Sequence, residues 1–103
     1  MKVYGTSTCP DCVDAKANLD YYKIPYEYVD VCESVRTLKE FTQLRDSKEI
    51  FEECKKNGSI GIPAIIKDDG DITLDWESVI HESGNEVIHV SNGQACGIDG
   101  KGC

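Results

Sequence analysis

At 103 residues the chain is long enough for one domain with a modest core. Its formal net charge of −8 argues against binding to a nucleic-acid backbone, which requires clustered Lys and Arg side chains. No apolar run approaches the roughly 20 residues of a membrane-spanning helix, and the first residues carry too little apolar sequence for a secretory signal. We therefore expect a cytoplasmic protein, in which closely spaced cysteines serve catalysis or metal binding rather than structural disulfides.

The first third of the chain predicts a strand, a helix and a second strand. Lys2–Gly5 is a short apolar run typical of a buried strand. Pro10 suits the first position of a helix, where a missing N–H costs nothing, and this makes Cys9 the N-cap. Apolar residues at helical spacing continue that helix to about Lys23, and Tyr26–Asp30 predicts the second strand. This order indicates a crossover between two parallel strands.

The middle of the chain predicts two helices and a hairpin. Ser34 and Ser47 are both suited to cap helices, and Gly58 marks the end of the second. The apolar runs 62–67 and 72–74 flank the turn sequence Asp68-Asp69-Gly70-Asp71, which predicts an antiparallel hairpin.

The last predicted element is a short helix capped by Asp75, with Trp76, Val79 and Ile80 on its apolar face. The complete order is βαβααββα, an α/β domain over residues 1–90. From residue 91 the sequence is polar and glycine-rich, so 91–103 is expected to form a flexible C-terminal tail.

The motif Cys9-Pro10-Asp11-Cys12 carries the chemistry of the sequence. A thiol at a helix N-terminus faces unpaired N–H groups and the positive end of the helix dipole, which favour the thiolate and lower its pKa. Cys12 lies one turn inside the helix, where it should be less exposed and less acidic. The spacing therefore predicts an attacking thiol and a resolving thiol.

With Gly61-Ile62-Pro63 some fifty residues after this motif and ahead of the hairpin, the chain resembles the glutaredoxin-like members of the thioredoxin-fold oxidoreductases. The resemblance covers roughly residues 1–82 and implies a thioredoxin-like fold with a central four-stranded mixed sheet flanked by helices. It implies a catalytic nucleophile at Cys9, a resolving thiol at Cys12 and a cis Ile62–Pro63 bond. The substrate-binding residues that it implies are Thr8, Pro10, Ile62 and Pro63.

The function that follows is that of a dithiol-disulfide oxidoreductase acting on protein or small-molecule disulfides, without a bound organic cofactor or metal. Its electron donor would be glutathione or a thioredoxin-type reductase, and the protein is expected to be a monomer. Two alternatives stay open: an iron–sulfur or other metal-binding module, and a non-catalytic redox sensor or adaptor. A proline directly after the first cysteine generally disfavours cluster assembly in the family.

Three positions depart from the pattern of glutathione-binding relatives. Thr6 stands where a Lys or Arg is usual, and Thr73 and Leu74 replace two glycines after the hairpin. Asp11 stands where an aromatic residue is common, and its carboxylate opposes formation of the Cys9 thiolate. We therefore expect Cys9 to be less acidic than the corresponding thiol of relatives with an aromatic residue there.

The remaining cysteines divide into two pairs. Cys96 and Cys103 form C-x6-C in the expected tail, either as an auxiliary redox pair or soft-metal clip, or as two exposed thiols with no dedicated role. Cys32 and Cys54 lie on or beside apolar helix faces, which favours packing in the core. Neither His81 nor His89 has metal-ligand spacing to the cysteines.

Overall fold

The computed structural model describes residues 1–89. Its elements follow the predicted order, with a 3-10 turn added before the third α-helix: β1 (Lys2–Gly5), α1 (Pro10–Tyr21), β2 (Glu27–Asp30), α2 (Val35–Ser47), η1 (Glu49–Phe51), α3 (Glu52–Asn57), β3 (Ala64–Ile66), β4 (Ile72–Thr73) and α4 (Trp76–Glu82). The strands form one mixed sheet in the order β2-β1-β3-β4. β1 is parallel to β2 and antiparallel to β3, and β3 pairs with β4 as the predicted hairpin. The α/β, thioredoxin-like fold is confirmed.

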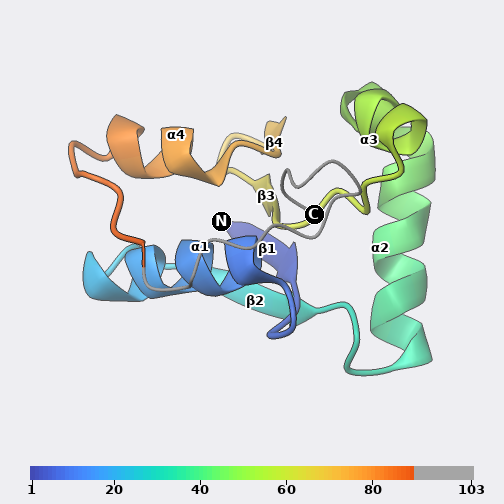
Figure 1. Ribbon diagram of the computed structural model, residues 1–103, viewed down its shortest axis with the longest axis horizontal. Coiled ribbons are helices and arrows are strands. Elements are labelled where there is room, and N and C mark those ends of the chain that lie inside the picture. The colour runs from blue at the N-terminus through green and yellow to red at the C-terminus, as the bar shows by residue number, and fades with distance from the viewer. Residues whose placement is uncertain (90–103) are drawn as a thin grey trace.

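The sheet lies between two layers of helices, with α1 and α4 on one side and α2 and α3 on the other (Figure 1). Successive strand residues point to opposite faces of a sheet, so each strand contributes to both sides. Val3 and Ile65 pack in a core with α1 and α4, whereas Tyr4 and Ala64 belong to a second core with Phe41 of α2. This second core also contains both thiols of the CPDC motif, so the motif is part of the packed interior.

Local sequence signals fix the starts of three helices. Pro10 occupies the start of α1 and Cys9 is the N-cap in extended backbone, as predicted. Ser34 caps α2 through a reciprocal pair of hydrogen bonds with Thr37, each 3.2 Å long. The Asp75 carboxylate accepts from the Ser78 N–H at the start of α4. These caps satisfy backbone N–H groups that have no partner inside their helices.

Two expectations about the helices were wrong. Ser47 does not begin a helix; it is the last residue of α2, and the next turn starts at Glu49. α1 ends at Tyr21 rather than at about Lys23, which adopts a positive φ of 56°. Val13 and Tyr21 lie on the solvent-facing side of α1. The side of this helix that packs on the sheet carries the buried residues Cys12, Ala15 and Leu19.

The predicted tail at 91–103, and the domain boundary at residue 90, lie outside the described residues. Within residues 1–89, no helix has the length and apolar character needed to cross a membrane.

Candidate active site

The CPDC motif lies where β1 ends and α1 begins. The loop after Gly5 turns back on itself, so that the Cys9 N–H donates to the Thr6 carbonyl at 3.3 Å. The Val13 N–H then donates to the Cys9 carbonyl at 3.0 Å, which closes the first turn of α1. Both cysteines are present as thiols rather than as a disulfide, and they are 2% and 1% exposed. The topology therefore holds the two sulfur atoms side by side at one end of the sheet.

The Cys9 sulfur is placed where negative charge is stabilised. The hydrogen bond from the Cys12 thiol is the largest influence, and it lowers the Cys9 pKa below the ordinary value of a cysteine. The backbone N–H groups of Cys12 and Asp11 act in the same direction, as expected at a helix N-terminus. Burial and the Asp11 carboxylate oppose them. The net effect favours a Cys9 thiolate, and Asp11 weakens that preference as expected from its charge.

Cys12 is shifted in the opposite direction. Its pKa is raised well above the ordinary value because its proton is held in the hydrogen bond to Cys9, and burial adds to the effect. The Thr6 backbone N–H acts the other way and favours the Cys12 thiolate. Two adjacent thiols with opposed pKa shifts provide an attacking thiolate and a protonated second thiol, the division of roles that a two-step exchange requires.

The space around Cys12 depends on a glycine. A β-carbon on Gly5 would stand 2.9 Å from the Cys12 sulfur and 2.9 Å from the Tyr28 hydroxyl oxygen, closer than real β-carbons approach other atoms. The missing side chain of Gly5 thus lets α1 and β2 bring the thiol and the phenol together. Sequence reasoning did not single out Tyr28, because nothing in the local pattern links it to Cys12.

The Ile62–Pro63 peptide bond is cis, in agreement with what the resemblance implied. Ile62 is buried in the same cluster as Cys9 and Cys12, so the loop before β3 lies against the CPDC motif. Gly61 before it has a φ of 98°, and a β-carbon there would stand 2.8 Å from the Phe51 ring. A glycine is therefore required for the chain to pass Phe51 and reach this position.

Arg45 of α2 holds the same loop from its other end. Its guanidinium donates from Nε to the Ile60 carbonyl and from a terminal nitrogen to the Ser59 carbonyl, both at 2.8 Å. A planar guanidinium suits two such acceptors, because its donors are fixed in one plane. Sequence reasoning missed Arg45, since no motif links it to residues 59–62.

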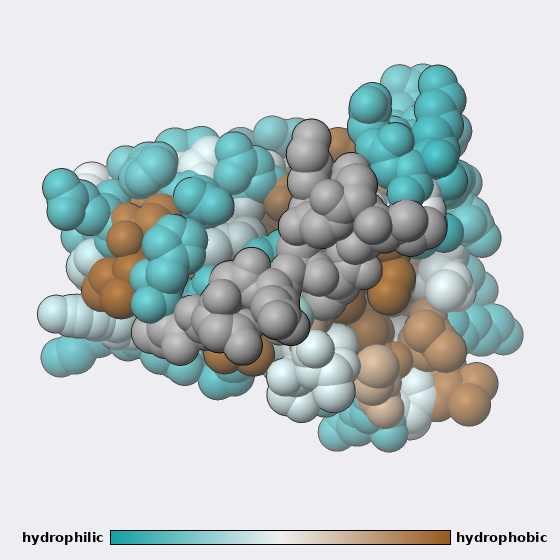
Figure 2. Space-filling model, viewed as in Figure 1, coloured by the Kyte–Doolittle hydropathy of each residue, from teal (hydrophilic) through white to brown (hydrophobic). Residues whose placement is uncertain are grey.

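A groove of about 360 Å³ lies beside this loop. Thr8 and Ile62, two of the four residues implied to bind substrate, are in its wall together with Leu38, Phe41 and Arg45. Pro10 and Pro63, the other two, are not among its lining residues; Pro10 is half-buried and Pro63 is buried. Leu38 and Ile60 are about half exposed, and Figure 2 shows apolar surface over this α2 side of the molecule.

The comparisons with known proteins identify the family. The sequence model described as Glutaredoxin matches residues 1–72. The chain belongs to the glutaredoxin family. A protein of Haemophilus influenzae strain Rd, described only as uncharacterized, is 40% identical over 73 residues, which are 71% of this chain and 85% of that protein. No solved structure matches significantly.

In this glutaredoxin the position expected to anchor a glutathione carboxylate is an uncharged residue, Thr6, in the wall of the groove. Thr6 is buried, and it carries no charge that could pair with a carboxylate. Among the described residues that line the groove, the cation is Arg45, whose donors are directed to the loop carbonyls. Residue 6, where the family pattern would place a Lys or Arg, is therefore uncharged in this chain.

The other cysteines of this glutaredoxin are not all where packing arguments put them. Cys32 is exposed, contrary to expectation: Val31 points into the core, and Cys32, the next residue, turns outward with its N–H bonded to the Asp30 carboxylate at 2.9 Å. Cys54 is half-buried, close to Gly61. Cys96 and Cys103 lie outside the described residues. Within the described part of the chain, no cluster of three or more His, Cys, Asp or Glu side chains is arranged to hold a metal ion.

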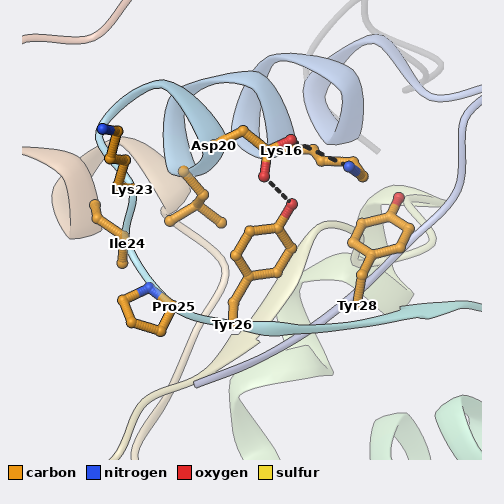
Figure 3. Close-up of a pocket in the computed structure, with 8 residues that line it drawn as sticks. Lys16, Asp20, Lys23, Ile24, Pro25, Tyr26 and Tyr28 are labelled. Carbon is orange, nitrogen blue, oxygen red and sulfur yellow. Dashed lines mark hydrogen bonds and ion pairs between the residues drawn. The ribbon is translucent and has the colours of Figure 1, made fainter.

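A cavity of about 630 Å³ lies between α1 and β2 (Figure 3). Inside it the Tyr26 hydroxyl donates to Asp20 at 2.6 Å, and the Lys16 ammonium donates to the other oxygen of the same carboxylate at 3.1 Å. Tyr28 stands next to Tyr26 with its hydroxyl pointing toward α1. A smaller cavity of about 290 Å³ shares Lys16, Asp20 and Tyr28 with it and has Cys12 in its wall.

Proposed function

We propose that this glutaredoxin is a dithiol-disulfide oxidoreductase in which Cys9 is the nucleophile and Cys12 resolves the intermediate. The observation that carries the proposal is the hydrogen bond between the two thiols, which lowers the pKa of Cys9 and raises that of Cys12. A thiolate is the form of cysteine that attacks a disulfide. One sulfur is therefore prepared to react first, and its neighbour retains its proton until the second step.

The reaction has two steps. The Cys9 thiolate attacks one sulfur of the substrate disulfide, a Cys9–substrate bond forms, and the first substrate thiolate leaves and takes a proton from water. Cys12 then loses its proton to water and attacks the Cys9 sulfur, which releases the second substrate thiolate. The substrate disulfide gains two electrons and becomes two thiols, while Cys9 and Cys12 become a disulfide.

We propose that the groove beside the cis-proline loop receives an extended segment of the substrate. Thr8 of the active-site loop and Ile62 of the cis-proline loop both line it, and exposed Leu38 and Ile60 offer apolar contacts. Main-chain groups near Ile62 would pair with the substrate as an added strand, which is a common way to recognise an extended peptide. These features favour protein disulfides over small charged ones.

A dithiol enzyme must be reduced again after each turnover, by glutathione or by a thioredoxin-type reductase. Thr6 is buried and uncharged, which weakens the case for glutathione. We therefore expect faster turnover with a thioredoxin-type reductase than with glutathione and its reductase.

The experiment that tests the function measures reduction of insulin disulfides with each donor system in turn. Wild type, Cys9→Ser, Cys12→Ser and the double variant Cys96→Ser/Cys103→Ser are compared. We expect Cys9→Ser to lose all turnover and Cys12→Ser to lose turnover of protein disulfides. Retained turnover in Cys9→Ser would contradict the proposal, and loss in the double variant would give Cys96 and Cys103 the role of an auxiliary pair.

A further inference from the structure

The Tyr28 hydroxyl lies beside the resolving thiol, although the two residues come from different elements. Tyr28 is in β2 and Cys12 is in α1, and both the hydroxyl oxygen and the sulfur are 2.9 Å from the point where a β-carbon on Gly5 would stand. The same two residues also line one cavity of about 290 Å³ under α1. The hydroxyl therefore occupies the space next to the sulfur that must attack in the second step.

This hydroxyl is not engaged elsewhere among residues 1–89, where no hydrogen bond to it is found. Its neighbour Tyr26 provides the contrast, because the Tyr26 hydroxyl is bound to Asp20 at 2.6 Å. In Figure 3 the two phenols stand side by side, and the dashed line to the carboxylate starts from Tyr26. Of these two neighbouring tyrosines, Tyr28 has the hydroxyl that can turn toward Cys12.

The second step creates a need for a donor at Cys12. In the reduced protein the Cys12 proton is shared with the Cys9 thiolate, which makes Cys12 a poor acid. Once Cys9 is bound to substrate, Cys12 must become a thiolate in a nearly closed environment, where charge without hydrogen-bond donors is costly. The Thr6 N–H provides one donor. A second donor would raise the population of the attacking form.

We propose that the Tyr28 hydroxyl donates a hydrogen bond to the Cys12 thiolate and so promotes resolution of the mixed disulfide. The proposal rests on the two-step function above and adds a positioning residue to its second step. No proton is transferred from the phenol: the Cys12 proton goes to water in the cavity, and the Tyr28 O–H bond stays intact. Burial and the nearby Cys12 sulfur hold the Tyr28 pKa well above its ordinary value, so the phenol keeps the proton that it donates.

A single-turnover reaction with dithiobis(nitrobenzoate) separates the two steps. Attack by Cys9 releases one coloured thiolate, and attack by Cys12 releases the second. The full chain is used, with serine at the four other cysteines so that only the motif reacts: Cys32, Cys54, Cys96 and Cys103. For Tyr28→Phe we expect an unchanged first release and a second release slowed about tenfold, the effect of losing one hydrogen bond to a charged group.

Tyr26→Phe is the matched control, since it removes a hydroxyl two residues away, just before β2, that is bound to Asp20 instead. It should leave both releases at the wild-type rate. The inference is overturned if Tyr28→Phe changes neither release, if it slows both equally, or if Tyr26→Phe has the same effect. Absence of a second release with Tyr28 intact, or its persistence in Cys12→Ser, would instead overturn the two-thiol function.

Discussion

The side chain of Asn18 is joined to the backbone of Ile88 by two hydrogen bonds. The amide nitrogen donates to the Ile88 carbonyl at 2.6 Å, and the Ile88 N–H donates to the amide oxygen at 2.8 Å. Tyr22 binds the Glu86 carbonyl at 2.6 Å, and His89 lies 3.4 Å from the Asp14 carboxylate. The segment after α4 therefore runs back along α1 toward the thiols.

We expect Asn18→Ala to release this segment and to lower the free energy of unfolding by about 1–3 kcal/mol, because a partly buried pair of hydrogen bonds is lost. Hydrogen exchange at residues 86–89 should become faster, which mass spectrometry can measure. Asn85→Ala is the control, since the side-chain amide of Asn85 donates to the Ser83 hydroxyl rather than to the 86–89 segment. Unchanged protection of 86–89 in Asn18→Ala would contradict this role.

The hydrogen bond between the two thiols makes the acidity of Cys9 depend on residue 12. Cys12→Ala removes the donor, so the Cys9 pKa should rise. Cys12→Ser retains a hydrogen-bond donor, so the Cys9 pKa should stay close to its lowered wild-type value. The rate of alkylation by iodoacetamide rises as pH passes through the Cys9 pKa, so its midpoint should move to higher pH in the alanine variant. Equal midpoints for all three proteins would exclude the hydrogen bond as the cause.

Asp11 opposes the Cys9 thiolate by its charge. In Asp11→Asn this repulsion is gone while the backbone N–H remains, so the Cys9 pKa should fall further and the alkylation midpoint should move to lower pH. At a pH below the wild-type midpoint we expect severalfold faster alkylation of Cys9. Asp46→Asn, an exposed position on α2, removes the same charge far along the chain and should have no effect. A midpoint that stays in place or rises in Asp11→Asn would refute the argument.

Gly5 is predicted to tolerate no side chain. Gly5→Ala would force its β-carbon against Cys12 and Tyr28, and we expect a loss of about 1–3 kcal/mol in the free energy of unfolding, measured with urea. The same change in Gly70, which has a positive φ but open space around it, provides the comparison for a glycine without close neighbours. If Gly5→Ala were as stable as wild type and carried out thiol–disulfide exchange at the same rate, the close packing of Gly5 against Cys12 and Tyr28 would be unimportant.

Arg45 is predicted to act on substrate binding rather than on thiol chemistry. Arg45→Met removes both hydrogen bonds to the loop before Ile62, which should raise the KM for a protein disulfide severalfold and leave the alkylation rate of Cys9 unchanged. Arg45→Lys keeps the charge but has a single donor group, so its KM should lie between those of wild type and Arg45→Met. Arg36→Met, at an exposed position on the same helix, is the control. An unchanged KM in Arg45→Met would contradict the prediction.

Features set by neighbouring residues could be predicted from the sequence. The start of α1 at Pro10, the cap at Ser34 and the cap at Asp75 each depend on contacts within about one helical turn. The turn at Asp68–Asp71 likewise predicted the hairpin of β3 and β4. Each signal is read over a few positions, so no knowledge of distant contacts is needed.

Contacts between distant residues could not be predicted in this way. Arg45 binds carbonyls 14 and 15 residues away, and Asn18 binds a backbone group 70 residues away. Tyr28 approaches Cys12 only because β2 pairs in parallel with β1 and Gly5 has no side chain. The exposure of Cys32 could not be predicted either. Val31 points into the core and the next side chain points outward, and helical spacing of apolar residues carries no signal for this change.

The outward position of Cys32 has a practical consequence for work with this protein. It is the one exposed thiol among the described cysteines, so in air it can join two chains without involving the CPDC motif. A band of twice the chain's mass on a non-reducing gel would then come from air oxidation of Cys32 during storage and not from a native dimer. Preparations that carry serine at this position give a cleaner measure of molecular size.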